Sequence, residues 1–157
     1  ELAVINSDID AIVIRTSWLY STYGSNFVKT IRRLGKEKNE LDVICDQLGT
    51  PTNASDLAKT CLDILAYSKE TNINAKGNVY HYSNEGVASW YDFAKAIMEL
   101  GKIACEVRPI ETKDYPTAAK RPSFSVLNKT KIKKDFEIKI PYWRDSLAIC
   151  ISKLKKI

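Results

Sequence analysis

Short apolar runs alternate along the chain with longer segments in which apolar residues recur every three or four positions. The short runs, rich in β-branched residues, predict buried strands, and the periodic segments predict amphipathic helices. The expected strands are 11–15, 41–45, 77–83 and 106–110. The expected helices are 27–38, 56–68, 90–100, 130–135 and 142–155. This alternation of strands with helices predicts an α/β fold.

Polar residues at the starts of two predicted helices support their boundaries. Asn26 directly precedes the helix 27–38, and its side-chain oxygen can cap that helix. Ser89 and Asp92 have the spacing of a capping box at the start of the third helix. Gly101 is placed to end the same helix in a left-handed conformation.

Composition and charge are those of a folded globular protein. The chain has 157 residues, of which 45% are hydrophobic and 27% charged, and no apolar run approaches the roughly 18 residues that span a bilayer. The net charge of +5 is concentrated in residues 129–157. A solvated, lysine-rich helical face explains this excess, and the alternative is a tail that attracts anions or nucleic acid. Because the lysines lack the interleaved aromatic platform for stacking bases, we expect no nucleic-acid partner. Because no apolar run is of spanning length, we expect no membrane partner.

The cysteines and the single histidine do not have the spacing of a metal site. No two of the four cysteines are separated as zinc ligands or redox pairs are, so we expect no metal. Each cysteine has apolar neighbours, which predicts buried, reduced thiols in a reducing cytoplasm. His81 lies on a predicted strand and is expected to be structural. The four cysteines are Cys45, Cys61, Cys105 and Cys150.

The largest cluster of candidate binding side chains follows the first predicted strand. Ligands of open α/β sheets bind beyond the carboxyl ends of the strands, and residues 15–20 there read Arg-Thr-Ser-Trp-Leu-Tyr. They offer hydroxyl groups, a guanidinium and an indole. The helix that follows Asn26 has free N–H groups that can bind an anion. These groups suit a ligand with a sugar and a phosphate, and the alternative is that Trp18 fills a domain junction.

Five motifs follow one another along the whole chain. They are Arg-Thr-Ser-Trp-Leu-Tyr at 15–20, Tyr-Gly-Ser-Asn-Phe-Val at 23–28, Asp-Gln-Leu-Gly-Thr-Pro-Thr at 46–52, Tyr-His-Tyr-Ser-Asn-Glu-Gly at 80–86 with Ser-Trp-Tyr-Asp-Phe-Ala at 89–94, and Lys-Arg-Pro-Ser-Phe-Ser at 120–125. In this order they resemble the C-terminal half of the dTDP-4-dehydrorhamnose reductase family, within the extended short-chain dehydrogenases/reductases. The resemblance implies the C-terminal portion of an NAD(P)-binding Rossmann-like fold with the smaller substrate-binding lobe. Residues 1–50 would complete the Rossmann half, and residues 51–157 would form mainly the substrate-binding lobe.

The resemblance implies a reaction, but the family's catalytic motif has no counterpart here. The family reduces the 4-keto group of dTDP-4-dehydro-L-rhamnose with NADPH or NADH to give dTDP-L-rhamnose. Its Gly-rich loop and catalytic Tyr-x-x-x-Lys precede the strand that ends here at Arg15, where neither motif is found. We therefore expect a fragment, beginning at Glu1 without methionine, that has no catalytic residue and is inactive alone. Tyr91 and Lys95 match Tyr-x-x-x-Lys, but they belong to the substrate-lobe motif and are not assigned a catalytic role.

The resemblance also implies roles for individual residues. Trp18 would contact the deoxysugar of the ligand, and Arg121 can bind its pyrophosphate unless it forms a loop-anchoring ion pair. Phe124 stands where the family more often has a polar residue, so no polar role is assigned there. The residues expected near the nicotinamide end of the cofactor are Arg15, Thr16 and Ser17. The other residues expected at the sugar nucleotide are Asn26, Phe27, Gln47 and Thr50, of which the last two could instead form a structural turn.

Two other functions are compatible with the pattern. One is a non-catalytic, reductase-like regulatory or binding subunit, and the other is a nucleic-acid binder built on the basic tail. The strands 11–15 and 41–45 are expected to complete the Rossmann sheet. Without sheet neighbours they would expose apolar edges, so we expect that the chain either associates with itself, for example as a homodimer, or was cut from a longer folded protein.

Overall fold

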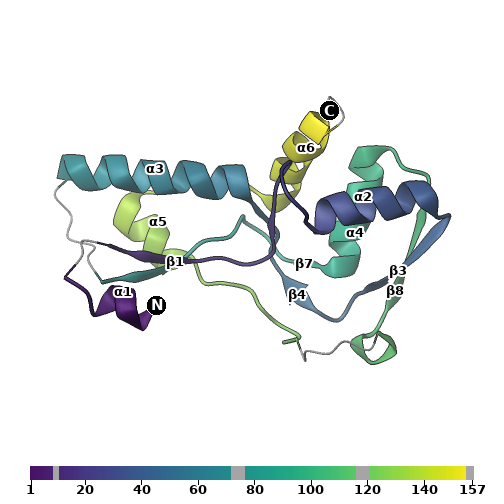
Figure 1. The fold of residues 1–157 in the computed structure, drawn as a ribbon, viewed down its shortest axis with the longest axis horizontal. Helices are drawn as coiled ribbons and strands as arrows, with labels where there is room; N and C mark the ends of the chain where they lie inside the picture. Colours follow the sequence, from purple (N-terminus) through teal and green to yellow (C-terminus); the bar gives the residue numbers. More distant parts are fainter. Residues whose placement is uncertain (9–10, 72–76, 116–120, 155–157) are drawn as a thin grey trace.

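The computed structural model describes residues 1–8, 11–71, 77–115 and 121–154, and it is elongated along one axis (Figure 1). Its helices are α1 (Leu2–Ile5), α2 (Phe27–Glu37), α3 (Ala54–Thr71), α4 (Trp90–Gly101), α5 (Thr130–Phe136) and α6 (Trp143–Leu154), with a 3-10 turn, η1 (Thr112–Asp114). Its strands are β1 (Val13–Arg15), β2 (Leu19–Tyr20), β3 (Glu40–Ile44), β4 (Leu48–Gly49), β5 (Thr52–Asn53), β6 (Val79–His81), β7 (Ala88–Ser89) and β8 (Glu106–Ile110).

The described strands form four two-stranded ladders, and the predicted α/β class is confirmed. The ladders β1–β6, β2–β5 and β3–β8 are parallel, whereas β4–β7 is antiparallel. The expected strands 11–15 and 41–45 do not pair with each other, because β1 pairs with β6 and β3 pairs with β8. The division of the chain at residue 50 stays a prediction.

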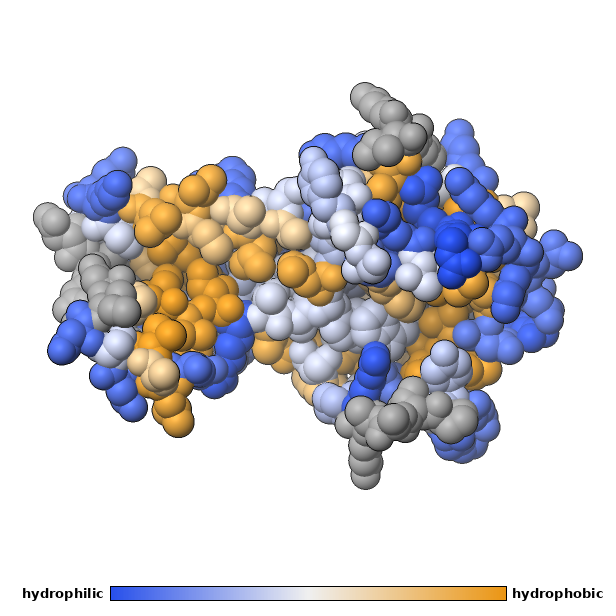
Figure 2. Space-filling model, in the orientation of Figure 1, coloured by the Kyte–Doolittle hydropathy of each residue, from blue (hydrophilic) through white to orange (hydrophobic). Residues whose placement is uncertain are grey.

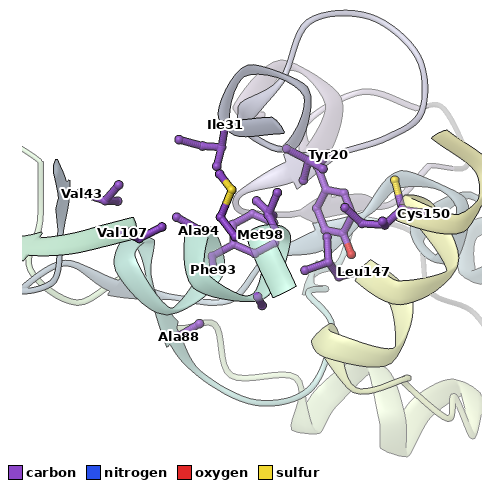
Figure 3. Close-up of a cluster of buried hydrophobic side chains, with 14 of the residues drawn as sticks. Tyr20, Ile31, Val43, Ala88, Phe93, Ala94, Met98, Val107, Leu147 and Cys150 are labelled. Carbon is purple, nitrogen blue, oxygen red and sulfur yellow. The ribbon is translucent and has the colours of Figure 1, made fainter. Parts of the chain in front are cut away.

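Each long parallel ladder has its own hydrophobic core. The larger core lies between α2, α4, α6 and the β3–β8 ladder, where Phe93 and Ile97 are fully buried (Figure 3). The smaller core holds Ile64 of α3, Tyr80 of β6 and Ile132 of α5. In Figure 1 the β3–β8 ladder with α2 and α4 lies at one end of the molecule, and β1 with α3 and α5 lies at the other.

The start of α4 agrees with the sequence pattern, whereas its end does not. Ser89 and Asp92 form the predicted capping box, in which the Ser89 hydroxyl accepts from the Asp92 backbone N–H over 3.0 Å. Gly101 was expected to end the helix, but it lies in the last turn, and the left-handed residue is Lys102, with φ 54°. A Cβ at Gly101 would lie 3.1 Å from Ile103 Cδ1, so this glycine allows Ile103 to fold back onto the helix.

A buried polar network joins the two ends of the molecule at Asn84. The Asn84 amide donates to Asp56 Oδ2 of α3 over 2.7 Å and to Ser146 Oγ of α6 over 3.1 Å. Its Oδ1 accepts from the Asn53 backbone N–H over 2.8 Å. Lys129 Nζ, itself buried, donates to the Asn84 carbonyl over 2.9 Å. Elements from both cores therefore depend on one fully buried side chain.

Apolar side chains are exposed at the end of the molecule that holds β1 and α3. Figure 2 shows hydrophobic residues gathered at the end that holds β1 and α3. On α3, Leu62 and Leu65 leave 67% and 60% of their surface exposed. No helix in the described ranges is both long and apolar enough to cross a membrane.

The four cysteines are free, but the expectation that all are buried is wrong. Cys150 is buried in the larger core, whereas Cys45, Cys61 and Cys105 are partly exposed. Cys45 directly follows β3 and Cys105 directly precedes β8.

Candidate functional site

Two adjoining pockets lie beside α2 and the start of α4. The first, which we call the α2–β3 cavity, has a volume of about 310 Å³ and is walled by α2, β3, Trp90 and Tyr115. The second, which we call the Trp18 pocket, has a volume of about 350 Å³. The residues common to both linings are Gln47, Trp90 and Arg121. The two pockets are therefore neighbouring compartments of one candidate site.

Trp18 and Trp90 form a stacked pair at the Trp18 pocket. Their ring centroids are 3.5 Å apart and the ring planes differ by 7°. The Trp18 backbone is left-handed, with φ 48°, a conformation that is unusual for a bulky residue and persists only where its surroundings hold it. The backbone of Trp18 accepts from Thr52 N over 3.1 Å. A Cβ at Gly49 would lie 2.5 Å from Trp18 Cε2, so only glycine leaves room for the indole.

Gln47 lines both pockets and is held by the 3-10 turn η1. Its Nε2 donates to Thr112 Oγ1 over 3.0 Å, and its side chain is almost wholly buried. Thr112 in turn donates from its hydroxyl to Asp46 Oδ1 over 2.6 Å. Hydrogen bonds from the Thr112 hydroxyl and backbone hold the pKa of the Asp46 carboxyl below its usual range.

Arg121 lines both pockets and brings a positive charge to the candidate site. Its side chain is exposed, and it forms no ion pair or hydrogen bond with any residue in the described ranges. The alternative of a loop-anchoring ion pair therefore has no support among those residues. A free guanidinium beside two indoles suits an anionic group on a ligand that also has an apolar ring.

Phe27 is the other predicted substrate-binding residue that lines a pocket, whereas Asn26 and Thr50 line neither. Phe27 lies in the wall of the α2–β3 cavity, with its ring 4.6 Å from that of Trp90. Asn26 caps α2, accepting from Lys29 N over 3.2 Å, as its position before the helix predicted. Thr50 is fully buried and donates to the Gly86 carbonyl over 2.7 Å. The ligand-binding roles of all three residues stay predictions.

The three residues expected near a cofactor lie at the carboxyl end of β1 and differ in what they contact. Arg15 forms an ion pair with Glu1, with Nη2 2.6 Å from Oε1, and its Nη1 lies 3.4 Å from His81 Nε2. Thr16 is exposed. Ser17 lines the Trp18 pocket and donates to the Thr50 carbonyl over 3.3 Å. Only Ser17 of the three therefore reaches the pockets.

Two residues that line the pockets, Trp90 and Tyr115, were not among the predicted site residues. Trp90 was expected only as a helix residue, although its position directly after the capping Ser89 placed it at an exposed helix start. Tyr115 lies just after η1, where the pattern gave no signal. Tyr91 packs against the larger core and Lys95 is exposed, and neither lines a pocket. Across the described residues, no three His, Cys, Asp or Glu side chains are grouped as metal ligands.

Comparison with known proteins gives a consistent set of relatives. Residues 1–156 match the model of the RmlD substrate binding domain. The chain is 41% identical over 143 residues to a dTDP-4-dehydrorhamnose reductase of Aggregatibacter actinomycetemcomitans, covering 87% of this chain and 48% of that protein. It is 38% identical to the spore coat polysaccharide biosynthesis protein SpsK of Bacillus subtilis, covering 88% of this chain and 46% of that protein.

A solved structure agrees with these sequence matches. The crystal structure of dTDP-4-dehydrorhamnose reductase from Bacillus anthracis in complex with NADP superposes with a TM-score of 0.82 and 35% identity. The superposition covers 90% of this chain and 48% of that one. The chain thus spans about half the length of the curated relatives it matches.

Proposed function

The chain belongs to the RmlD substrate-binding domain family, and on that premise we propose that it is the substrate-binding part of a dTDP-4-dehydrorhamnose reductase. The complete enzyme would reduce the 4-keto group of dTDP-4-dehydro-L-rhamnose with NADPH or NADH, giving dTDP-L-rhamnose in the cytoplasm. Residues 1–50 would complete the nucleotide-binding half, and residues 51–157 would form most of the substrate-binding lobe. The observation that carries this proposal is the meeting of Trp18, Gln47 and Arg121 at two adjoining pockets.

The chemistry of these pockets fits a sugar nucleotide. The stacked indoles of Trp18 and Trp90 give a flat apolar surface that can pack against the face of a deoxysugar. The Arg121 guanidinium can bind a diphosphate through two parallel hydrogen bonds. Ligand sites commonly combine such apolar walls with a few polar groups that fix orientation. In this proposal the chain binds and orients the substrate.

The cofactor would meet this chain only at the end of β1. When bound, a nicotinamide cofactor supplies the hydride for the reduction. The exposed Thr16 hydroxyl and the Ser17 hydroxyl at the Trp18 pocket fit polar groups near the nicotinamide end. Arg15 is engaged by Glu1, so it could bind the cofactor only after that exposed ion pair opens. No Gly-rich phosphate loop occurs in the sequence, and the 157-residue chain alone is therefore proposed to be inactive.

Calorimetric titration of the chain with dTDP tests the substrate-binding role. We expect saturable binding that weakens about tenfold in Arg121→Ala and less in Arg121→Lys, because lysine keeps the charge but cannot form the bidentate contact. Lys153→Ala, at the far end of α6, is the matched control for charge and is expected to change nothing. The same chain should leave NADPH unoxidised in the presence of dTDP-4-dehydrorhamnose. Absence of dTDP binding would contradict the substrate-binding role, and turnover would contradict the proposed inactivity.

We further propose that copies of the chain associate through the apolar surface at the β1 and α3 end. Leu62 and Leu65 of α3 are both more than half exposed, and exposed apolar surface of this kind favours association. Sedimentation equilibrium is expected to show a dimer or larger species for the unsubstituted chain. Leu62→Lys with Leu65→Lys should shift it to the monomer, whereas Ile149→Lys on α6 should not. A monomer before substitution would contradict this proposal.

A further inference from the structure

The chain from β4 to β5 meets Trp18 and the residue before it at three points. A Cβ at Gly49 would lie 2.5 Å from Trp18 Cε2, so the backbone there lies directly against the indole. The Thr50 carbonyl accepts from the Ser17 hydroxyl over 3.3 Å. The Thr52 backbone N–H donates to the Trp18 carbonyl over 3.1 Å. The position of this part of the chain therefore sets both the backbone and the ring of Trp18.

The Thr50 hydroxyl fastens the same part of the chain to the backbone of Gly86. Its Oγ1 donates to the Gly86 carbonyl over 2.7 Å, and the side chain is fully buried. Gly86 has φ 93°, and a Cβ there would lie 2.8 Å from Cδ1 of Trp143, which belongs to the larger core. Thr50 lines neither the Trp18 pocket nor the α2–β3 cavity. Its hydroxyl thus joins the chain beside Trp18 to a point that the larger core fixes.

The conformation of Trp18 depends on such support. Its left-handed backbone, with φ 48°, is unfavourable for a bulky residue unless the surrounding structure holds it. Stacking on Trp90 holds only the indole, and Trp90 directly follows β7, which pairs with β4. A shift of the chain between β4 and β5 would therefore change the place of the Trp18 indole in its pocket.

We propose that Thr50 is a positioning residue, whose hydroxyl holds Trp18 in the left-handed conformation that presents its indole to the deoxysugar of the ligand. This inference rests on the proposed function and adds a residue that acts through Trp18 from outside the pockets. The part of the affinity that comes from the sugar would depend on Thr50. The part that comes from the diphosphate, which Arg121 would bind, would not.

Titrating the 157-residue chain with dTDP and with dTDP-L-rhamnose tests this inference, because the second ligand adds the deoxysugar to the first. We expect Thr50→Val, which keeps the shape of the side chain but removes the donor, to weaken dTDP-L-rhamnose about tenfold and dTDP less than about twofold. Thr50→Ser keeps the hydroxyl and should restore both affinities. Thr60→Val, at another buried threonine that lines neither pocket, is the matched control and should change neither affinity.

A double-mutant cycle tests whether Thr50 acts through Trp18. Trp18→Ala alone should weaken dTDP-L-rhamnose more than dTDP. In that background the indole is absent, so adding Thr50→Val should weaken dTDP-L-rhamnose less than about twofold further. A further tenfold loss would show that Thr50 does not act through Trp18 and would overturn the inference.

The outcomes separate this inference from the function on which it rests. If Thr50→Val changes the two affinities by the same factor, or not at all, the positioning role is overturned while nucleotide binding stands. If neither ligand binds the unsubstituted chain, the proposed function is overturned together with the inference. Thermal unfolding verifies that each variant is folded. If Thr50→Val is not, Ser17→Ala removes the bond to the Thr50 carbonyl at a half-buried position, and the same cycle with Trp18→Ala decides the matter.

Discussion

Replacing Asn84 by alanine is expected to lower the free energy of unfolding by about 3 kcal/mol. The side chain is fully buried and links Asp56, Ser146 and the backbone of Asn53 through hydrogen bonds of 2.7–3.1 Å. Removing it leaves the buried Asn53 N–H without its acceptor and takes one of the donors from the partly buried Asp56 carboxylate. Because such groups lose both their protein partner and water, the cost exceeds that of an exposed hydrogen bond.

Urea unfolding at equilibrium measures this change. Asn39→Ala is the matched control, since Asn39 is exposed between α2 and β3, and it should change stability by less than about 0.5 kcal/mol. If Asn84→Ala is no more destabilising than Asn39→Ala, the network does not join the two cores as described. Loss of cooperativity in the Asn84 variant, with the two ends unfolding separately, would instead support that joining role.

Gly49→Ala is expected to displace Trp18 from Trp90 and to weaken dTDP binding by tenfold or more. A methyl group at this position would lie 2.5–2.7 Å from three atoms of the indole, so the ring must move. Overpacking of a buried contact costs about 1–3 kcal/mol of stability. The left-handed Trp18 backbone makes relief by a small shift difficult, because the stack and β2 hold it on both sides. Tryptophan fluorescence and dTDP titration measure the two effects.

A double-mutant cycle distinguishes displacement of Trp18 from general damage. In a Trp18→Ala background the indole is absent. Adding Gly49→Ala to that background should lower the free energy of unfolding by less than about 0.5 kcal/mol. Trp18→Ala by itself should reduce dTDP affinity without the steric contribution. If Gly49→Ala lowers the free energy of unfolding equally with and without the indole, the close approach of Gly49 to Trp18 is not the cause of the destabilisation.

The parts of the fold that local chemistry determines were predictable, whereas those that depend on long-range pairing were not. The helix after Asn26 begins where its capping side chain predicts, and the Ser89 capping box starts α4 as its spacing predicts. The two-residue strands β2, β4, β5 and β7 fall in segments that read as loops or short turns. Their backbone hydrogen bonds join segments that are far apart in the sequence, so no local sequence pattern predicts these strands.

The candidate site shows the same division. Trp18, Gln47 and Arg121 were identified from their motifs, and the structure places them at adjoining pockets. Trp90 was missed because its helical position suggests packing, and only the β4–β7 ladder brings it over the Gln47 segment. Thr50 belongs to the same motif as Gln47, yet it is directed inward to the Gly86 carbonyl. A motif therefore indicates which loop meets the ligand, but not which of its side chains faces outward.

The parallel ladders also bear on how fast the chain can fold. β1 pairs with β6, and β3 pairs with β8, so each pairing requires a long intervening segment to close into a loop first. Helices such as α3 can form from local contacts alone, but the strands gain their hydrogen bonds only once that loop entropy has been lost. Folding of this chain is therefore limited by long-range search, and its apolar strands stay exposed to neighbouring molecules until the ladders close.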